Sequence, residues 1–129
     1  MDFHPEHFTV WVEIPSSDVD QAVPYYEAVL MTKLEKTVMG LDTTFVFKTA
    51  THPDGISGHV YPGKPAGDGS GPTIHLAAPG KLEDTLDRVR AAGGTVISDP
   101  IPFPFGRFAY TTDLDGNSIG LFEPASEAA

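Results

Sequence analysis

Hydrophobic and polar residues alternate near the beginning of the chain, over residues 8–14. Val12 and Ile14 share one face of an extended segment, and Trp11 and Glu13 share the opposite face. A period of two is typical of a strand that buries one face, so this pattern predicts a half-buried strand.

The period then changes to that of a helix. Apolar residues recur every three or four positions over residues 19–30, which predicts an amphipathic helix. Pro24 lies beyond the first turn, so we expect it to remove one backbone hydrogen bond and to bend the helix. Further strands are predicted over residues 33–38, 43–49 and 56–61, with a turn at 52–55 that joins the last two as a hairpin.

The same order of elements returns in the second half of the chain. A strand is predicted over residues 73–78, a helix over 81–92 ended by Gly93-Gly94, and strands over 95–98, 107–112 and 118–122. Residues 100–104 hold three prolines, which predicts a rigid loop. Residues 63–71 hold four glycines and one proline, as is typical of a linker.

The sequence is also repeated in its residues. Residues 44–49 match 107–112 at an offset of 63, and residues 54–62 match 115–124 with one inserted residue. A repeat of this kind predicts two copies of one supersecondary unit, each roughly βαβββ. A length of 129 residues suits one domain with one core. We therefore predict a single domain, residues 1–129, with modules 7–62 and 72–124 joined by the linker 63–71.

Composition excludes several classes of function. The net charge of −10 argues against nucleic-acid binding, which requires clustered Lys and Arg to neutralise phosphates. The absence of cysteine excludes a disulfide framework, a thiolate zinc site and a cysteine nucleophile. No apolar run approaches the ~18 residues that span a bilayer, and the N-terminus does not resemble a signal peptide. We predict a cytoplasmic protein without a membrane partner.

Three segments carry a family resemblance. They are Trp11–Pro15 followed by Asp18 and Tyr25-Tyr26, then Ala91–Val96, and then Asp113–Ile119. Together with the two βαβββ modules, they resemble the vicinal oxygen chelate superfamily, which includes glyoxalase I, extradiol dioxygenases, and bleomycin and fosfomycin resistance proteins. The resemblance implies an α+β fold whose two modules curl a mixed sheet around a cavity. It also implies, for metal-dependent members, a divalent ion held by His, Glu or Gln from the first and last strands of each module.

The metal-ligand positions of that superfamily can be carried over to this chain. They fall on Trp11, Gly58, Gly120 and either Thr73 or Ile74. None of these side chains is a competent ligand for a divalent ion, which binds through imidazole or deprotonated groups. We therefore predict no metal and no other cofactor, with a divalent metal at relocated residues as the open alternative.

Candidate acid–base chemistry rests on Glu13 and His75. Ile74 and Leu76 have the pattern of a core face, which places His75 on the opposite face as the counterpart of Glu13. The two could form a general acid–base pair, or they could be polar residues at the wall of the cavity. His59 is expected to be a surface or interface histidine, because alternation places it off the face of Gly58.

The expected cavity is roomy and aromatic. Candidate ligand-binding residues are Trp11, Phe47, Tyr110 and Phe122, with Arg107 as either an anchor for an anion or a solvated strand end. The apolar loop 102–107 either closes this cavity or packs on a second subunit, and the resemblance implies a homodimer.

The predicted function is the binding of a small apolar or aromatic molecule without the usual metal. The alternative is an enzyme of the same superfamily, a lyase, isomerase or dioxygenase, that uses relocated residues such as Glu13 and His75.

Overall fold

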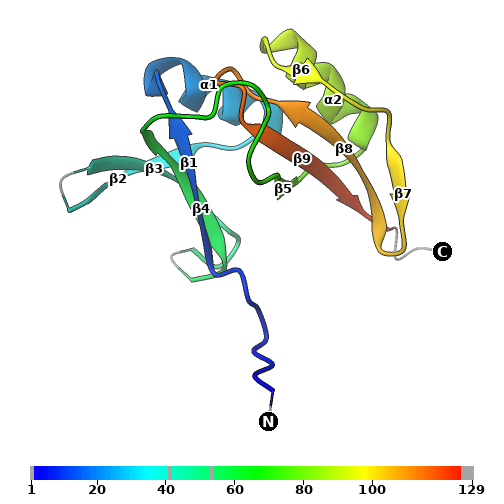
Figure 1. Cartoon of the computed structure of the whole chain (residues 1–129), viewed down its shortest axis with the longest axis horizontal. Coiled ribbons are helices and arrows are strands. Elements are labelled where there is room, and N and C mark those ends of the chain that lie inside the picture. Colours follow the sequence, from blue (N-terminus) through cyan, green and yellow to red (C-terminus); the bar gives the residue numbers. More distant parts are fainter. Residues whose placement is uncertain (1, 41, 53, 126–129) are drawn as a thin grey trace.

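The computed structural model describes residues 2–40, 42–52 and 54–125, so Pro53 of the predicted turn lies outside the described residues. The first half of the chain contains, in order, β1 (Trp11–Ser16), α1 (Val19–Leu30), β2 (Leu34–Met39), β3 (Asp42–Phe47) and β4 (Ser57–Pro62). The second half contains β5 (Ile74–Ala77), α2 (Leu82–Ala91), β6 (Thr95–Val96), β7 (Ile101–Phe103), β8 (Gly106–Thr112) and β9 (Ser118–Pro124). The βαβββ order thus appears in both halves, with β7 as an additional strand in the second (Figure 1).

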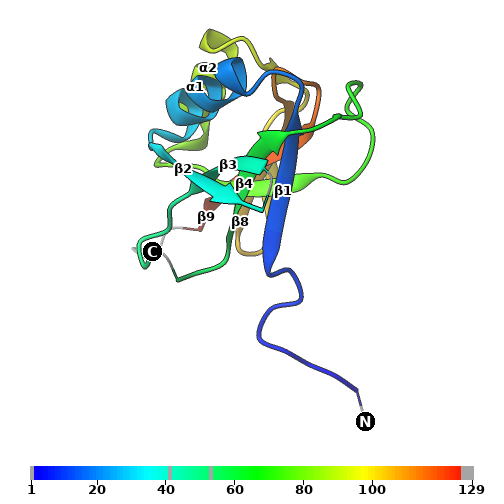
Figure 2. The ribbon, with the colours of Figure 1, turned by 90° about the vertical axis from the view of Figure 1, so that its left-hand side faces the viewer.

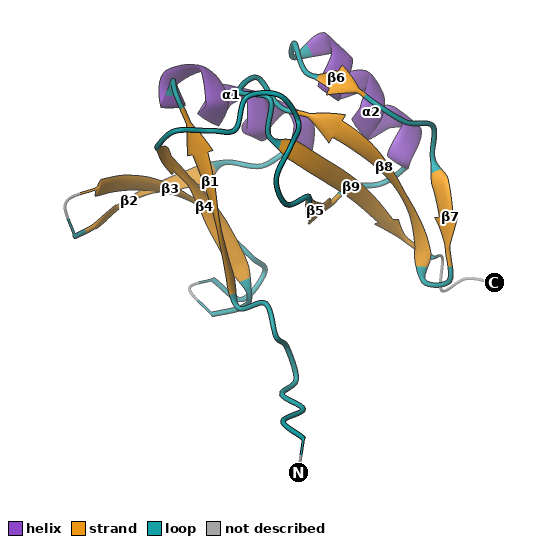
Figure 3. Ribbon diagram, in the orientation of Figure 1, coloured by secondary structure: helices purple, strands orange, loops and turns teal. Residues whose placement is uncertain are grey.

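Each half of the chain builds its own sheet. The first sheet has the strand order β1-β4-β3-β2, and the second has the order β5-β9-β8-β6, with β7 also paired to β8. The first strand of each module runs parallel to the last, and the remaining pairs are antiparallel. The helices α1 and α2 contact each other at one end of the two sheets (Figure 3). The predicted α+β class and two-module fold are confirmed, with the sheets standing as two separate sheets.

The prediction of a rigid loop over residues 100–104 is wrong in part. Residues Ile101–Phe103 form β7, whose Ile101 pairs with Phe108 and whose Phe103 pairs with Gly106. β7 lies at the edge of the sheet, where one side of a strand needs no ladder hydrogen bonds. Proline has no backbone N–H, and an edge strand tolerates that loss.

One hydrophobic core lies between the sheets and the helices. It includes Ile14 and Val60 of the first sheet, Leu121 of the second sheet, and Tyr26 and Val89 of the helices. We call the face of each sheet that packs on this core its inner face and the opposite face its outer face. Figure 2 shows both helices at one end of the molecule, with the N-terminal residues extending from the other end.

A hydrogen-bonded turn joins the second module to the first. The Asp113 carboxylate accepts the Tyr26 hydroxyl at 2.5 Å and the Asn117 side-chain N–H at 3.0 Å. It also accepts the backbone N–H groups of Asp115 and Asn117, each at 2.9 Å. Asn117 in turn donates to the backbone oxygen of Pro15 at 2.8 Å. Burial, and then the charge of Asp113, raise the pKa of Tyr26 well above its usual range, so the phenol stays a donor.

Within the described residues, no helix is long and apolar enough to cross a membrane.

Candidate functional site

The outer face of the first sheet carries a chain of three contacting side chains. The Trp11 indole N–H donates to Nδ1 of His59 at 2.9 Å, and Oε1 of Glu13 lies 3.3 Å from Nε2 of the same ring. The contacts form because β1 and β4 pair in parallel with Trp11 beside Ser57 and Glu13 beside His59. An indole can only donate, so Nδ1 carries no hydrogen and the neutral ring carries its hydrogen on Nε2.

His59 lies off the face of Gly58 as predicted, but it is not a surface histidine in the single chain. The residue is only 3% exposed, because Trp11 and Tyr61 lie against it with ring centroids 5.8 and 5.7 Å away. The side chain of Glu13 remains 66% exposed and Trp11 is 37% exposed, so a second molecule can reach both side chains.

Two shallow hollows flank this contact chain. One, of about 230 Å³, lies beside Trp11 and reaches Glu35 and Val46 on the neighbouring strands. The other, of about 100 Å³, lies between Glu13 and Tyr61. The outer face of the first sheet is therefore uneven, with the Trp11 indole beside one hollow and carboxylates lining both.

The outer face of the second sheet is aromatic. The His75 ring lies edge-on to Phe108 at 5.1 Å, and Phe108 lies edge-on to Tyr110 at 5.3 Å. Phe103 extends the cluster, with its ring centroid 6.2 Å from those of Phe108 and Phe122. We call these five residues the aromatic cluster. It is only partly buried, and Phe103 is 47% exposed.

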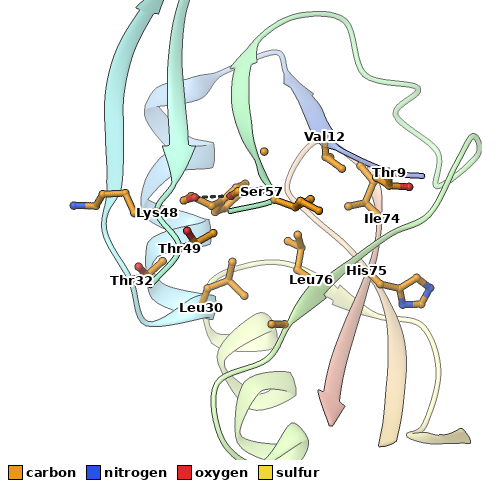
Figure 4. A pocket seen from close by; sticks show the side chains of 14 residues that line it. Thr9, Val12, Leu30, Thr32, Lys48, Thr49, Ser57, Ile74, His75 and Leu76 are labelled. Carbon is orange, nitrogen blue, oxygen red and sulfur yellow. Dashed lines mark hydrogen bonds between the residues drawn. The ribbon is translucent and has the colours of Figure 1, made fainter. Parts of the chain in front are cut away.

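A larger cavity lies elsewhere, between the two modules on their inner side. Its volume is about 440 Å³. Val12, Ile74 and Leu76 line its centre, whereas the His75 ring and the Lys48 amine point away from it (Figure 4). Phe47 lines this cavity too, and its backbone oxygen accepts the Ser57 hydroxyl at 2.5 Å. Phe47 also lines the hollow beside Trp11, but neither hollow contains Tyr110 or Phe122, with which the sequence grouped it.

Arg107 is engaged by two carboxylates of the chain itself. Its guanidinium donates to both oxygens of Glu83 on α2, at 2.7 and 2.5 Å, and to Glu123 on β9, at 2.8 and 3.1 Å. Hydrogen bonding to Arg107 holds the pKa of Glu83 at about 2, below its ordinary value of 4.5. This arrangement ties α2 to the second sheet and leaves little donor capacity for a ligand anion.

The Glu83–Arg107 pair predicts a pH dependence of stability. A carboxylate whose pKa is lower in the folded state stabilises the fold above its ordinary pKa and stops doing so as pH falls through the folded value. We expect Glu83→Gln to lower the thermal unfolding midpoint at pH 7 and to have almost no effect near pH 2. Thermal unfolding of both proteins across this pH range measures the difference. A difference that is constant with pH contradicts the assignment.

The structure changes one ligand position inferred from the family. Gly120 pairs with His75 on the outer face, and a Cβ atom added there would collide with the His75 ring. Its equivalent in the first sheet is His59, which pairs with Glu13, whereas Gly58 pairs with Val12 on the inner face. The sequence did contain a sign of this equivalence. Ser57 and Ser118 are the first residues of their strands, and aligning the two strands at these serines without a gap places His59 opposite Gly120.

The residues at the family's ligand positions do not fit a divalent ion. Trp11 offers only an N–H, Gly120 has no side chain, and both ring nitrogens of His59 already contact neighbours. The Thr73 hydroxyl is hydrogen-bonded to that of Ser118 at 2.6 Å. Within residues 2–40, 42–52 and 54–125, no three His, Asp or Glu side chains converge on one point.

Glu13 and His75, the predicted acid–base pair, are not brought together within one chain. Ile74 and Leu76 pack on the core as expected, so His75 lies on the outer face of the second sheet. Glu13 lies on the outer face of the first sheet, opposite to the buried Ile14. The shared core separates the two side chains, and only a second copy of the chain could place them in one site.

The superfamily of this protein is shown by comparison with family models. The family model of the Glyoxalase/Bleomycin resistance protein/Dioxygenase superfamily matches residues 7–121. The chain therefore belongs to this superfamily, and the resemblance read from its repeat is confirmed.

Several solved structures share the fold across nearly the whole chain. TnmS3, an antibiotic binding protein from Streptomyces sp. CB03234, is 22% identical with a TM-score of 0.64 over 95% of this chain and 100% of its own. The fosfomycin resistance protein FosX from Listeria monocytogenes (hexagonal form) is 16% identical, with a TM-score of 0.63 over 98% of both chains. The hypothetical protein SA1046 from S. aureus is 17% identical, with a TM-score of 0.66 over 92% and 99%. A comparison with curated protein sequences finds no match.

Proposed function

We propose that this protein binds a small, planar, apolar or aromatic molecule without a metal. The observation that carries the proposal is the partly exposed aromatic surface on both outer faces, with Trp11 on one sheet and the aromatic cluster on the other. Aromatic side chains left accessible in this way favour a ligand held by stacking. The likeness of the fold to TnmS3, which is an antibiotic binding protein, is consistent with this function.

The complete site is proposed to form in a homodimer. The two outer faces point away from each other in one chain, so the first sheet of one copy would face the second sheet of its partner. Such pairing would bury aromatic surface that is exposed in the single chain, which is the usual fate of large apolar patches. Location in the cytoplasm stays a prediction.

The donor set supports the proposal of a metal-free site. Trp11 and Gly120 offer no ligand atom, and the ring nitrogens of His59 are engaged. The enzymatic alternative stays a prediction, and in the proposed dimer it would bring Glu13 of one copy near the His75 of the other.

The binding function is tested with anthracene-9-methanol, a neutral planar probe. We expect the probe to quench the fluorescence of Trp11, the single tryptophan of the chain. Because stacking on one aromatic ring contributes about 1–3 kcal/mol, Trp11→Ala should weaken binding about tenfold, and Trp11→Phe much less. Equilibrium dialysis measures the affinities of the variants that lack the fluorophore.

The matched control is Val38→Ala on the edge strand β2, where the side chain is 70% exposed but does not belong to the outer face. This variant should bind the probe as the unmodified protein does. A Trp11→Ala protein that binds equally well would rule out the outer face of the first sheet as the site.

A further inference from the structure

The hydrogen-bonding capacity of the Trp11 face restricts what it can bind. The single indole N–H is used on Nδ1 of His59, and that ring, whose Nε2 lies 3.3 Å from Glu13, is only 3% exposed. Trp11 and His59 therefore offer a ligand no donor. What they leave for a ligand is the π face of the indole.

Two carboxylates stand near this indole, those of Glu13 and Glu35. The Glu13 carboxylate has about four lone-pair sites, and its side chain is 66% exposed. Glu35 lies on the same outer face as Glu13, at the same level across the strands. It pairs with Val46, and Val46 pairs with His59. The Tyr61 hydroxyl, which can donate or accept, completes the hollow beside Glu13.

The strands of the first sheet contribute no lysine or arginine to this face. Among the residues of β1, β2, β3 and β4, all of which are described, the only cationic side chain is Lys36. Lys36 pairs with Phe45, whose ring packs on the core, so its position belongs to the inner face. Glu35 is contacted by Nε2 of His52 at 3.2 Å, so the outer face joins an electron-rich ring mainly to the exposed Glu13 carboxylate.

We infer that the outer face of the first sheet selects a planar cation, which stacks on Trp11 and donates a hydrogen bond from a charged nitrogen to Glu13. This inference rests on the proposed binding function and names the chemical class of its ligand. A cation gains from the quadrupole of the indole, and tryptophan is the best aromatic partner for this interaction. A planar anion would be repelled by the Glu13 carboxylate and would find no donor on Trp11 or on the buried His59.

His59 acts in this site as a positioning residue. It is buried, and by accepting the indole N–H it fixes the orientation of the Trp11 ring across the sheet. Its other nitrogen lies 3.3 Å from the Glu13 carboxylate. An indole ring held in a fixed position loses less freedom when a ligand binds, which favours affinity.

Three tricyclic probes of similar size test the inference: proflavine as the cation, anthracene-9-carboxylate as the anion and anthracene-9-methanol as the neutral molecule. Equilibrium dialysis should show proflavine bound at least about tenfold more tightly than the anion. Glu13→Gln keeps the size of the side chain and removes its charge. It should weaken proflavine binding about three- to tenfold and change binding of the neutral probe less than about twofold.

A pair of variants separates the positioning role of His59 from a purely structural one. His59→Asn retains an oxygen near the position of Nδ1 and should preserve the Trp11 emission and most of the affinity for all three probes. His59→Leu removes the acceptor, and should shift the Trp11 emission and weaken all three probes together. Asp87→Asn on α2, whose side chain is 76% exposed, is the control for the loss of one negative charge.

The outcomes distinguish this inference from the function on which it rests. Equal binding of proflavine and the anion, or a Glu13→Gln protein that keeps full affinity for proflavine, overturns the inference while the binding function stands. Failure of all three probes to bind overturns both. Equal losses of proflavine affinity in Glu13→Gln and Asp87→Asn would show that the loss arises from the net charge of the protein, and this result would also overturn the inference.

Discussion

Replacing Asp113 by alanine is expected to lower the free energy of unfolding by about 3–4 kcal/mol, the largest effect on stability that we predict for a single side chain. Its carboxylate accepts hydrogen bonds from Tyr26, Asp115 and Asn117, and the Tyr26 hydroxyl is buried. Hydrogen bonds to a charged group contribute about 1.5–3 kcal/mol, and buried donors left without an acceptor add their own cost. Chemical denaturation followed by circular dichroism measures the change.

Related substitutions make this prediction specific. Tyr26→Phe removes one donor and leaves the carboxylate its other three, so we expect a loss of about 1–2 kcal/mol. Asp113→Asn keeps an oxygen acceptor and should lie between Tyr26→Phe and Asp113→Ala. Asp87→Asn, at an exposed position, should stay within about 0.5 kcal/mol of the unmodified protein. An Asp113→Ala protein as stable as Asp87→Asn would show that this turn does not hold the modules together.

The second large effect is expected for Phe108→Glu, which we predict to dissociate the homodimer and to abolish binding of planar probes. Phe108 lies at the centre of the aromatic cluster, in contact with His75, Tyr110 and Phe103. In the proposed dimer a carboxylate at this position would be buried without a partner, opposite Glu13 of the other copy. An uncompensated buried charge costs about 3–5 kcal/mol, so the dimer should weaken at least about a hundredfold.

Light scattering after gel filtration measures the mass of this variant, and circular dichroism checks its fold. Phe108 is partly exposed in the single chain, so the monomer should keep its secondary structure. Val38→Glu, at an exposed apolar position away from the outer face, is the matched control and should keep the mass of the unmodified protein. An unmodified protein that is monomeric, or a dimeric Phe108→Glu protein, would contradict the proposed arrangement.

Much of the fold followed from local patterns. The helix of residues 19–30 appears where the period of the hydrophobic residues placed it. The strand predicted over residues 8–14 forms over 11–16, and it contains Trp11 and Glu13 as expected. The Pro-rich β7 was missed because proline disfavours strands in general, whereas the tolerance of an edge strand depends on where the sheet ends. Position within a sheet is a property of the assembled chain, and the local pattern does not contain it.

The candidate site was predicted less completely. Trp11, Tyr110 and Phe122 lie on outer faces, but Phe47 lines the inner cavity and Arg107 is held by Glu83 and Glu123. Arg107 lies on the face of β8 opposite to Phe108 and Tyr110. The identity of its partners depends on how α2 packs against the second sheet. Long side chains of this kind find partners that are distant in sequence, so the pattern around them indicates little about their role.

The sequence by itself determined that two βαβββ modules are present, and that Trp11 and Glu13 share one face of a strand, because both features depend on repeats and periods over short distances. The tertiary structure decided which residues meet on that face. The pairing of β1 with β4 brought His59, 48 residues away, into contact with Trp11 and Glu13. The packing of both sheets on one core turned Glu13 and His75 to opposite outer faces. Strand register and sheet packing arise from long-range contacts, and for that reason the site could not be assembled from the sequence alone.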